Sequence, residues 1–134
     1  MKIIKKIALV IFKDKKVLMV REYKEKEVFY SLGGKIKPGE TDLDCLEREV
    51  GEEISCRIDP KTVNFLTEFE YKAHGKEDAL LNIRIYTGRL IGEPKPSSEI
   101  VEIGYFDTKS DKKHLTEMAQ RKIFPWLLKH QLIG

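Results

Sequence analysis

Apolar and polar residues alternate along much of this chain, which is the pattern of half-buried β-strands. Runs rich in β-branched and aromatic residues predict strands over residues 3–12, 17–23, 28–32, 62–72, 80–90 and 103–106. Charged segments at 13–16 and 74–78 predict tight connections between neighbouring strands. The proline-containing segments 58–60 and 92–98 are expected to interrupt the strands. The pattern therefore predicts a protein built largely from sheet.

The segment that follows Glu40 and includes Leu43 to Ile54 has the period of a helix instead. Its apolar residues recur every three or four positions and form one stripe that can pack on a core. These residues are Leu43, Leu46, Val50 and Ile54. Thr41 or Asp42 is well placed to cap the helix, and Asp44 completes an approximate capping box from Thr41.

A second helix is expected near the C-terminus. It begins at Thr116 and extends as far as Leu132, with a kink or a restart at Pro125. Strands interrupted by one helix and closed by another predict an α+β fold of two layers or a sandwich. Because 134 residues suffice for one core but not for two ordinary domains, a single domain over residues 1–134 is expected.

Composition narrows the class of protein without identifying a function. A content of 41% hydrophobic and 35% charged residues is typical of a soluble globular protein. The net charge of +3 helps an anionic substrate only mildly, and it is too small to predict a nucleic-acid-binding protein. No apolar run approaches the length of a membrane span, and the uncharged run 7–12 is short for a signal peptide.

The two cysteines, Cys45 and Cys56, lie eleven residues apart along the predicted acidic helix and its end. The helical rise places them roughly 15 Å apart, which is beyond the reach of a disulfide. Free thiols suit a reducing compartment, so we expect a cytoplasmic protein without a membrane partner.

The first predicted helix also carries a group of acids. Glu49, Glu52 and Glu53 stand at positions i, i+3 and i+4, so their carboxylates share one flank beside the apolar stripe. Such charge runs are most often solvated helix faces. Here, however, Gly33-Gly34 and Glu40 lie just before the helix and can bring further oxygens to the same place. Several converging oxygens suit a hard cation such as Mg²⁺, which also binds phosphate.

The spacing of these residues resembles the signature of the Nudix hydrolases. That signature has a glycine, a glutamate six positions later, and then Arg-Glu-apolar-x-Glu-Glu-x-Gly-apolar. The matching residues are Gly34, Glu40, Arg48, Glu49, Val50, Glu52, Glu53 and Cys56. Ser55 stands where the family usually has the glycine that closes the helix in the left-handed conformation. The departure concerns the geometry of this helix end and leaves the acids unchanged.

The resemblance implies an α/β/α sandwich with a mixed β-sheet between helices. It implies that a nucleoside diphosphate linked to another group is hydrolysed with Mg²⁺ or Mn²⁺. Carried over by position, the metal would be held by Glu49, Glu52, Glu53 and the backbone carbonyl of Gly34. Glu52 or Glu53 would lie near the attacking water, Arg48 would orient the acids, and Glu40 would support the loop. A further acid from outside the signature is expected, with Glu102 favoured over Glu99.

The segment Gly33-Gly34-Lys35 resembles the MutT-type enzymes, which release pyrophosphate from nucleoside triphosphates, and these three residues are expected to bind substrate. Leu32 departs from the proline of many relatives. Hydrolysis of a nucleotide sugar, ADP-ribose or a dinucleoside polyphosphate stays open, as does a non-catalytic nucleotide sensor. An RNA-decapping enzyme would need a basic groove, which the net charge does not favour. The expected partner is a small nucleotide, bound by a monomer or a homodimer.

Overall fold

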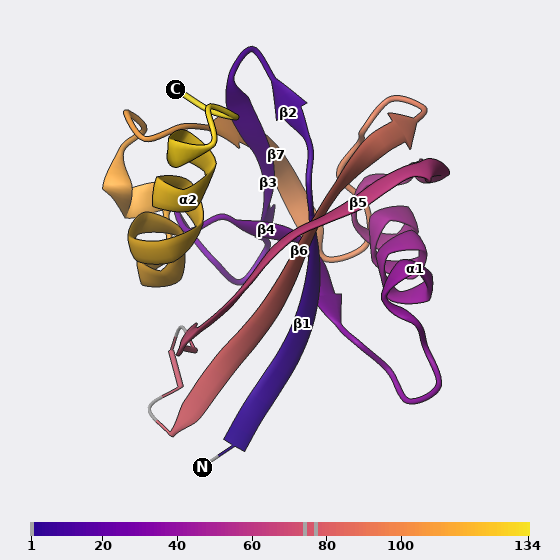
Figure 1. The fold of residues 1–134 in the computed structure, drawn as a ribbon, viewed down its shortest axis with the longest axis horizontal. Coiled ribbons are helices and arrows are strands. Elements are labelled where there is room, and N and C mark those ends of the chain that lie inside the picture. The colour runs from indigo at the N-terminus through magenta and orange to yellow at the C-terminus, as the bar shows by residue number, and fades with distance from the viewer. Residues whose placement is uncertain (1, 74, 77) are drawn as a thin grey trace.

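The computed structural model describes residues 2–73, 75–76 and 78–134 (Figure 1). The strands of the described part are β1 (Lys2–Val10), β2 (Phe12–Lys13), β3 (Lys16–Glu22), β4 (Tyr30–Lys35), β5 (Arg57–Lys72), β6 (Ala79–Ile91) and β7 (Ile100–Phe106). The helical elements are α1 (Asp42–Ile54), a 3₁₀ turn η1 (Lys112–His114), a π-helical segment η2 (Ala119–Ile123) and α2 (Phe124–Lys129). The predicted connection 74–78 includes His74 and Glu77, which lie outside the described residues.

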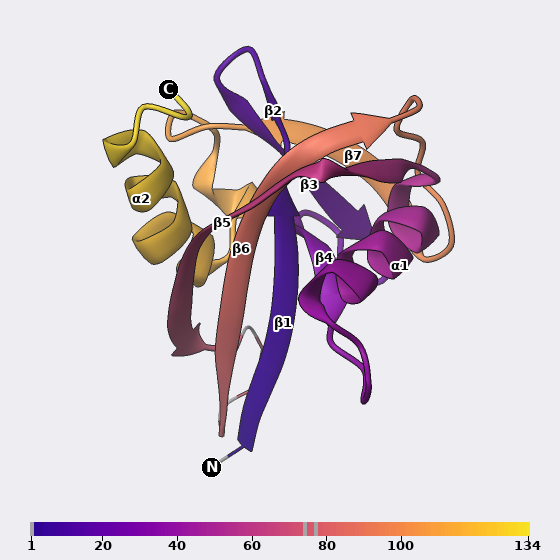
Figure 2. The same cartoon turned by 45° about the vertical axis from the view of Figure 1, so that its right-hand side comes forward.

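The strands form one mixed, strongly curled sheet in the order β2-β3-β4-β1-β6-β5, with β7 paired to β3. Strand β1 runs parallel to β6 and antiparallel to β4, whereas β5 and β6 form a long antiparallel pair. Helices α1 and α2 lie on opposite sides of this sheet, as the two views in Figures 1 and 2 show. The expected α/β/α sandwich with a mixed sheet between helices is therefore confirmed.

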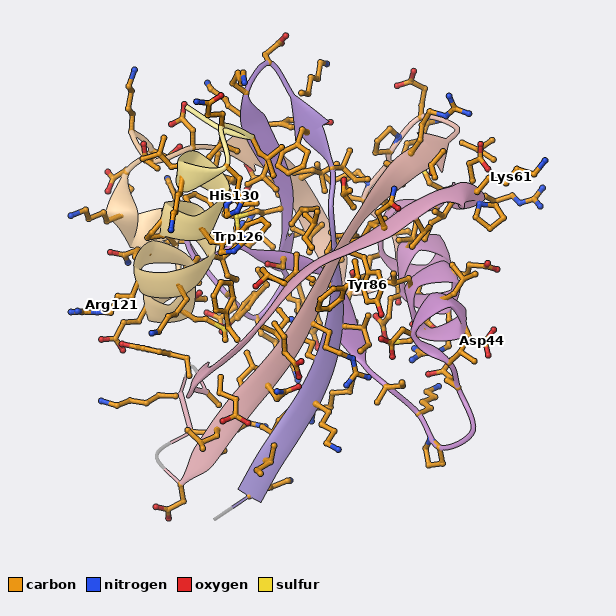
Figure 3. The ribbon with its side chains drawn as sticks, in the orientation of Figure 1. Asp44, Lys61, Tyr86, Arg121, Trp126 and His130 are labelled. Carbon is orange, nitrogen blue, oxygen red and sulfur yellow. The ribbon has the colours of Figure 1, made fainter. Side chains whose placement is uncertain are left out.

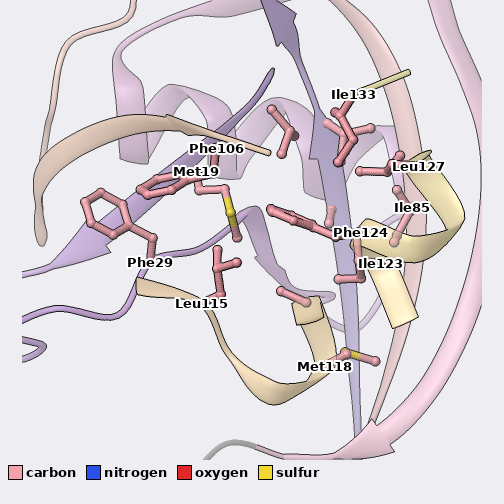
Figure 4. Packing of buried hydrophobic residues seen from close by; sticks show 14 of the residues in the cluster. Met19, Phe29, Ile85, Phe106, Leu115, Met118, Ile123, Phe124, Leu127 and Ile133 are labelled. Carbon is pink, nitrogen blue, oxygen red and sulfur yellow. The ribbon is translucent and has the colours of Figure 1, made fainter. Parts of the chain in front are cut away.

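The central strands are buried on both faces, which explains their unbroken apolar sequence. On β1, Ala8 and Val10 belong to the core beneath α2, while Ile7 and Leu9 belong to the core beneath α1. Strand β3 divides its apolar residues between the two cores in the same alternating way. Figure 4 shows the α2 side, where Phe106, Phe124 and Leu127 are among the buried side chains. The sheet is thus the shared wall of two cores.

Two predicted breaks in the sheet are wrong. The strand expected to end at residue 32 continues as β4 through both glycines, because Gly33 packs directly on the backbone of β1, where a Cβ would overlap the Ile7 carbonyl oxygen. The segment 58–60 lies inside β5, whose pairing with β6 shifts register between Asp59 and Asn64. A proline is tolerated there since β5 is an edge strand with a bulge.

The ends of α1 follow the sequence closely. The Thr41 hydroxyl accepts a hydrogen bond from the Asp44 amide, and the Asp44 carboxylate accepts one from the Thr41 amide, which confirms the capping box. Ser55 closes the helix in the left-handed conformation, with φ 55° and ψ 37°. Serine therefore takes the backbone conformation that glycine adopts more easily.

The C-terminal helix is shorter and less regular than predicted. After Thr116, whose hydroxyl accepts a hydrogen bond from the Ala119 amide, the chain forms the wider π-helical turns of η2 and only then becomes α2. The wide turns directly precede Pro125, which has no N–H to donate to the preceding turn. Helix α2 ends at Lys129, before the predicted limit. Within the described residues, none of the helices combines the length and the apolar character that crossing a membrane requires.

Candidate active site

A pocket of about 440 Å³ opens beside α1, between the strands β1, β3 and β4 and the loop that precedes β7. We call it the acidic pocket, because five carboxylates and two lysines line it. The carboxylates belong to Glu22, Glu49, Glu52, Glu53 and Glu99, and the lysines are Lys6 and Lys35. Gly33 and Gly34 of β4 form part of its floor. The structure thus brings together the three signature acids of α1, both glycines and Lys35, whereas Glu40 of the signature is not part of the lining.

The acids of α1 are seated directly on the glycines of β4. A Cβ on Gly34 would overlap the Glu49 carboxylate, so a larger residue at this position would displace that side chain. The Gly33 amide donates a hydrogen bond of 2.8 Å to Glu53 Oε1. The Gly34 carbonyl accepts a weak hydrogen bond from the buried Cys45 thiol, at 3.6 Å. The helix acids and the buried Cys45 are therefore in direct contact with the backbone of both glycines.

Arg48 links the acid of the loop to an acid of the helix. Its guanidinium donates to Glu40 at 2.7 and 3.0 Å, to Glu49 at 2.6 Å and to the Lys35 carbonyl at 3.0 Å. Glu52 lies 3.6 Å from the same group, and its side chain is 52% exposed. The hydrogen bonds from Arg48 lower the pKa of Glu40 to about 2. The arrangement fixes the loop that leads into α1 and one wall of the acidic pocket.

Glu53 is the most perturbed carboxyl of the pocket. Burial raises its pKa to about 8, against the Gly33 amide and Lys6, which favour the ionised form, while Glu49 and Glu22 raise the pKa further. Burial also lowers the pKa of Lys6, although Glu53, Glu49 and Glu22 act in the opposite direction. Such a site gains from an additional cation, which would favour the ionised carboxylate and relieve the repulsion.

The donor set fits a hard divalent cation. The acidic side chains that line the pocket are all glutamates, which offer carboxylate oxygens as metal ligands. Mg²⁺ prefers oxygen ligands. Among the residues that the structure describes, no three carboxylate, histidine or cysteine side chains already form a metal-binding group. Glu49 is engaged with Arg48 and Glu53 with the Gly33 amide, so their remaining oxygens are the ones that could bind an ion.

The two candidate acids from outside the signature are placed differently. Glu102 stands opposite Arg21 in the β3–β7 pair, accepts a hydrogen bond of 2.8 Å from it, and is 53% exposed. It does not belong to the lining of the acidic pocket, whereas Glu99 does. The loop carrying Glu99 is fixed to α1, since the Lys95 and Ser97 amides donate to the carbonyls of Ile54 and Glu53.

Sequence reasoning missed Glu22 and Lys6 in the acidic pocket. Glu22 comes two residues after Val20, which also lines the pocket, so an acid at the end of an apolar strand was a usable signal. Lys6 similarly follows Ile4 on the pocket-lining face of β1. The pairing that brings these two strands to one pocket cannot be read from the spacing of their residues.

A larger pocket of about 980 Å³ adjoins the acidic pocket and reaches toward η2. The residues that line both are Ile4, Lys6, Glu22, Tyr30, Ser31 and Lys35. The Tyr30 hydroxyl donates to Glu25 Oε1 at 3.0 Å, and Lys6 Nζ lies 5.5 Å from the centre of the Tyr30 ring. Met118 and Ile123 add apolar surface at the far side. A ligand could therefore extend from the carboxylates into a roomier, partly apolar space.

The other end of α1 is held by a polar contact with β6. The Asp42 carboxylate accepts hydrogen bonds from Arg84 Nε and Nη2, at 2.9 and 2.7 Å, and from the Tyr86 hydroxyl. Tyr86, labelled in Figure 3, therefore serves the attachment of the helix. Tyr86 is not part of the lining of either pocket.

Known proteins resemble this chain both in sequence family and in fold. The NUDIX domain family matches residues 4–127, so the chain belongs to that family and is a Nudix hydrolase. Among solved structures, a MutT NUDIX hydrolase from Burkholderia pseudomallei is 17% identical with a TM-score of 0.77, covering 95% of this chain and 99% of its own.

Two further solved structures share the fold. The ORF135 protein of E. coli is 20% identical with a TM-score of 0.69, over 90% of this chain and 85% of its own. An ADP-ribose pyrophosphatase from Streptococcus suis is 19% identical with a TM-score of 0.63, over 95% of this chain and 90% of its own. A comparison with curated proteins finds no match. At these identities the likeness concerns the fold and leaves the substrate open.

Proposed function

We propose that this protein hydrolyses a nucleoside diphosphate linked to another group, with Mg²⁺ or Mn²⁺, and that its substrates are (d)NTPs cleaved to NMP and pyrophosphate. The observation that carries the proposal is the acidic pocket itself. Carboxylates from α1, β3 and the loop before β7 meet lysines from β1 and β4, and the larger pocket adjoins them. Phosphoanhydride hydrolysis needs carboxylate oxygens that hold a metal ion and positively charged side chains that bind the phosphates.

In this proposal Glu49, Glu52, Glu53 and the Gly34 carbonyl hold the metal. When bound, the ion supplies charge neutralisation and a more acidic water. Arg48 keeps Glu49 in place through its 2.6 Å hydrogen bond. These roles are carried over from the family signature, and the position of the groups around one pocket supports them.

Proton transfer from water needs a carboxylate close to the attacked phosphorus. Glu52 and Glu53 are the candidates on α1, and Glu99 is the candidate from outside the signature because it lines the acidic pocket. Glu102, paired with Arg21 on β7, is not proposed for this role. Lys35, with the backbone of Gly33 and Gly34, would contact the phosphate chain.

The MutT-type reaction is supported by the segment Gly33-Gly34-Lys35 and by the fold of the Burkholderia MutT hydrolase. ADP-ribose or a nucleotide sugar is the second candidate, since the larger pocket, at about 980 Å³, also has room for a group beyond a nucleoside. The two candidates differ in product, because only a triphosphate can yield pyrophosphate in one cleavage.

The test is hydrolysis of a nucleotide panel by the purified full chain. The panel contains the canonical and oxidised (d)NTPs, ADP-ribose, a UDP-sugar and a dinucleoside polyphosphate, each with Mg²⁺ and with Mn²⁺. Phosphorus NMR of the products should show NMP and pyrophosphate from at least one (d)NTP. Failure to hydrolyse any of these compounds with either metal contradicts the proposal. Tight binding without turnover would instead indicate a non-catalytic sensor.

A further inference from the structure

Two lysines stand directly opposite each other at the boundary between the two pockets. Lys6 of β1 and Lys35 of β4 are register partners in an antiparallel pair, and both line both pockets. Like charges at directly opposed positions of a sheet are destabilising. An arrangement of this kind is favourable when an anion binds between the two ammonium groups.

Lys6 is the less ordinary member of the pair. Its side chain is half-buried on a central strand, whereas Lys35 is exposed. Within the described residues, neither lysine forms an ion pair shorter than 4 Å. Lys6 Nζ instead lies over the Tyr30 ring, 5.5 Å from its centre, with Glu22, Glu49 and Glu53 as its charged surroundings. Withdrawing an ammonium from water in this way is costly unless an opposite charge or a hydrogen-bond acceptor compensates it, and a bound phosphate would supply both.

We propose that Lys6, together with Lys35, binds the phosphate chain of the substrate at the boundary between the two pockets. The proposal rests on the proposed function, because it takes a phosphorylated substrate for granted. It places a phosphate between the metal-binding acids on one side and the larger pocket on the other. Lys6 is then a substrate-binding residue that orients the scissile phosphoanhydride, and it is supplied by β1 independently of the α1 signature.

A different role for Lys6 would be to neutralise the carboxylates around it. The two roles predict opposite results when its charge is removed. A phosphate-binding Lys6 makes pyrophosphate binding depend on its charge. A lysine that only neutralises acids competes with the metal, so its removal would strengthen Mn²⁺ binding and leave pyrophosphate binding intact.

The experiment is calorimetric titration of the full chain with inorganic pyrophosphate in Mg²⁺, and separately with Mn²⁺ alone. Lys6→Met should weaken pyrophosphate binding on the order of 10-fold, the effect of losing one charged hydrogen bond. Lys6→Arg should restore most of it. Lys5→Met is the matched control, because Lys5 is the exposed neighbour on β1 and is not part of the lining of either pocket; it should bind as wild type does.

Pyrophosphate binding that is undetectable in wild type, or equal in wild type and Lys6→Met, overturns the proposal. Nucleotide hydrolysis measured in parallel separates this failure from that of the proposed function. If the wild type hydrolyses no nucleotide but Lys6→Met loses pyrophosphate binding, the phosphate-binding role of Lys6 is supported and the proposed function is contradicted. If nucleotides are hydrolysed normally but Lys6→Met binds pyrophosphate as wild type does, the proposed function is supported and the role of Lys6 is contradicted.

Discussion

The two helices cover opposite faces of one sheet but are attached to it by different chemistry. Helix α1 is fixed by charged groups at both ends, through Asp42 with Arg84 and Tyr86, and through Glu53 with the Gly33 amide. Helix α2 contributes apolar side chains such as Phe124 and Leu127 to the core beneath it. Apolar packing has no preferred direction, whereas hydrogen bonds fix the orientation of the groups that they join.

This difference indicates which side chains must be placed precisely. A core tolerates small displacements as long as its volume is filled, but carboxylates that share a cation must be placed closely. The face of the sheet beneath α1 therefore carries both an apolar core and a polar framework, by which we mean the hydrogen bonds of Asp42, Arg48 and Glu53. We expect changes on the α1 side to affect activity out of proportion to stability, and changes on the α2 side to do the opposite.

The largest expected effect is on turnover, from Glu53→Gln. Removing this carboxylate should reduce kcat on the order of 10²–10⁴-fold, the range for loss of a group that assists proton transfer. The fold should be unaffected, because a neutral amide replaces a buried carboxyl whose pKa is raised to about 8. Steady-state kinetics with the best nucleotide of the panel, together with thermal melting, would measure both.

Glu47→Gln is the control for this substitution. Glu47 is an exposed acid of the same helix that is not part of the lining of either pocket, so its variant should turn over normally. Near wild-type activity in Glu53→Gln would show that the role of this acid is misassigned.

The α2 side should behave in the opposite way. Leu127 is 1% exposed, and Leu127→Ala should lower the free energy of unfolding by about 2–5 kcal/mol through lost burial and a cavity. The folded fraction should keep the kcat of wild type. Urea denaturation and kinetics at a temperature well below the melting point would test both statements.

The neighbouring residue provides the comparison for that loss. Leu128 is 46% exposed, so Leu128→Ala should change the free energy of unfolding by less than about 0.5 kcal/mol. Equal losses in the two leucine variants would mean that α2 packs on the sheet through another face.

An intermediate effect is expected where α1 is joined to β6. Asp42→Asn should cost about 1–3 kcal/mol at pH 7, because it weakens the hydrogen bonds from Arg84 and Tyr86 to a charged acceptor. Arg84 keeps the pKa of Asp42 below its ordinary value of 3.8. The ionised carboxylate therefore stabilises the fold above that value, and the stabilisation is lost as the pH falls through the lower pKa of the folded state.

Urea unfolding at several pH values would test this linkage. The difference between wild type and Asp42→Asn should be full at pH 7 and should narrow below about pH 4. Asp59→Asn is the control, since Asp59 forms an ion pair with Arg89, which is 73% exposed, and should lose less than about 1 kcal/mol. A difference independent of pH would indicate that packing, and not the charge of Asp42, attaches the helix.

The sequence predicted the parts of the molecule that are local in the chain. The capping box of Thr41 and Asp44, the apolar stripe of α1 and its three acids all lie within one helix, so periodicity is enough to find them. Glu22 and Lys6 lie on separate strands, and only the pairing of the sheet brings them to the acidic pocket.

The errors have a similar physical origin. Gly33 and Gly34 looked like a loop because glycine is rare inside strands, yet both lie in β4, and the β1 backbone leaves no room for a Cβ at Gly33. Pro60 looked like a break because the sequence does not show that β5 lies at the edge of the sheet. An edge strand tolerates proline. Tertiary contacts decided both.

The smallest expected effect concerns the end of α1, where Ser55 adopts φ 55°. Ser55→Gly should raise the free energy of unfolding by about 0.5–1 kcal/mol, since glycine adopts the left-handed conformation without the steric cost of a Cβ. Ser55→Ala keeps the Cβ and should not show this gain, so the pair isolates the backbone effect in urea titrations. The acids of α1 end two residues earlier, and kcat should stay within about twofold of wild type because the polar framework, rather than the helix end, positions them. A gain in stability accompanied by a large loss of kcat would mean that the strained turn at Ser55 itself helps to place Glu53, and the polar attachment would then extend to the C-terminal end of the helix.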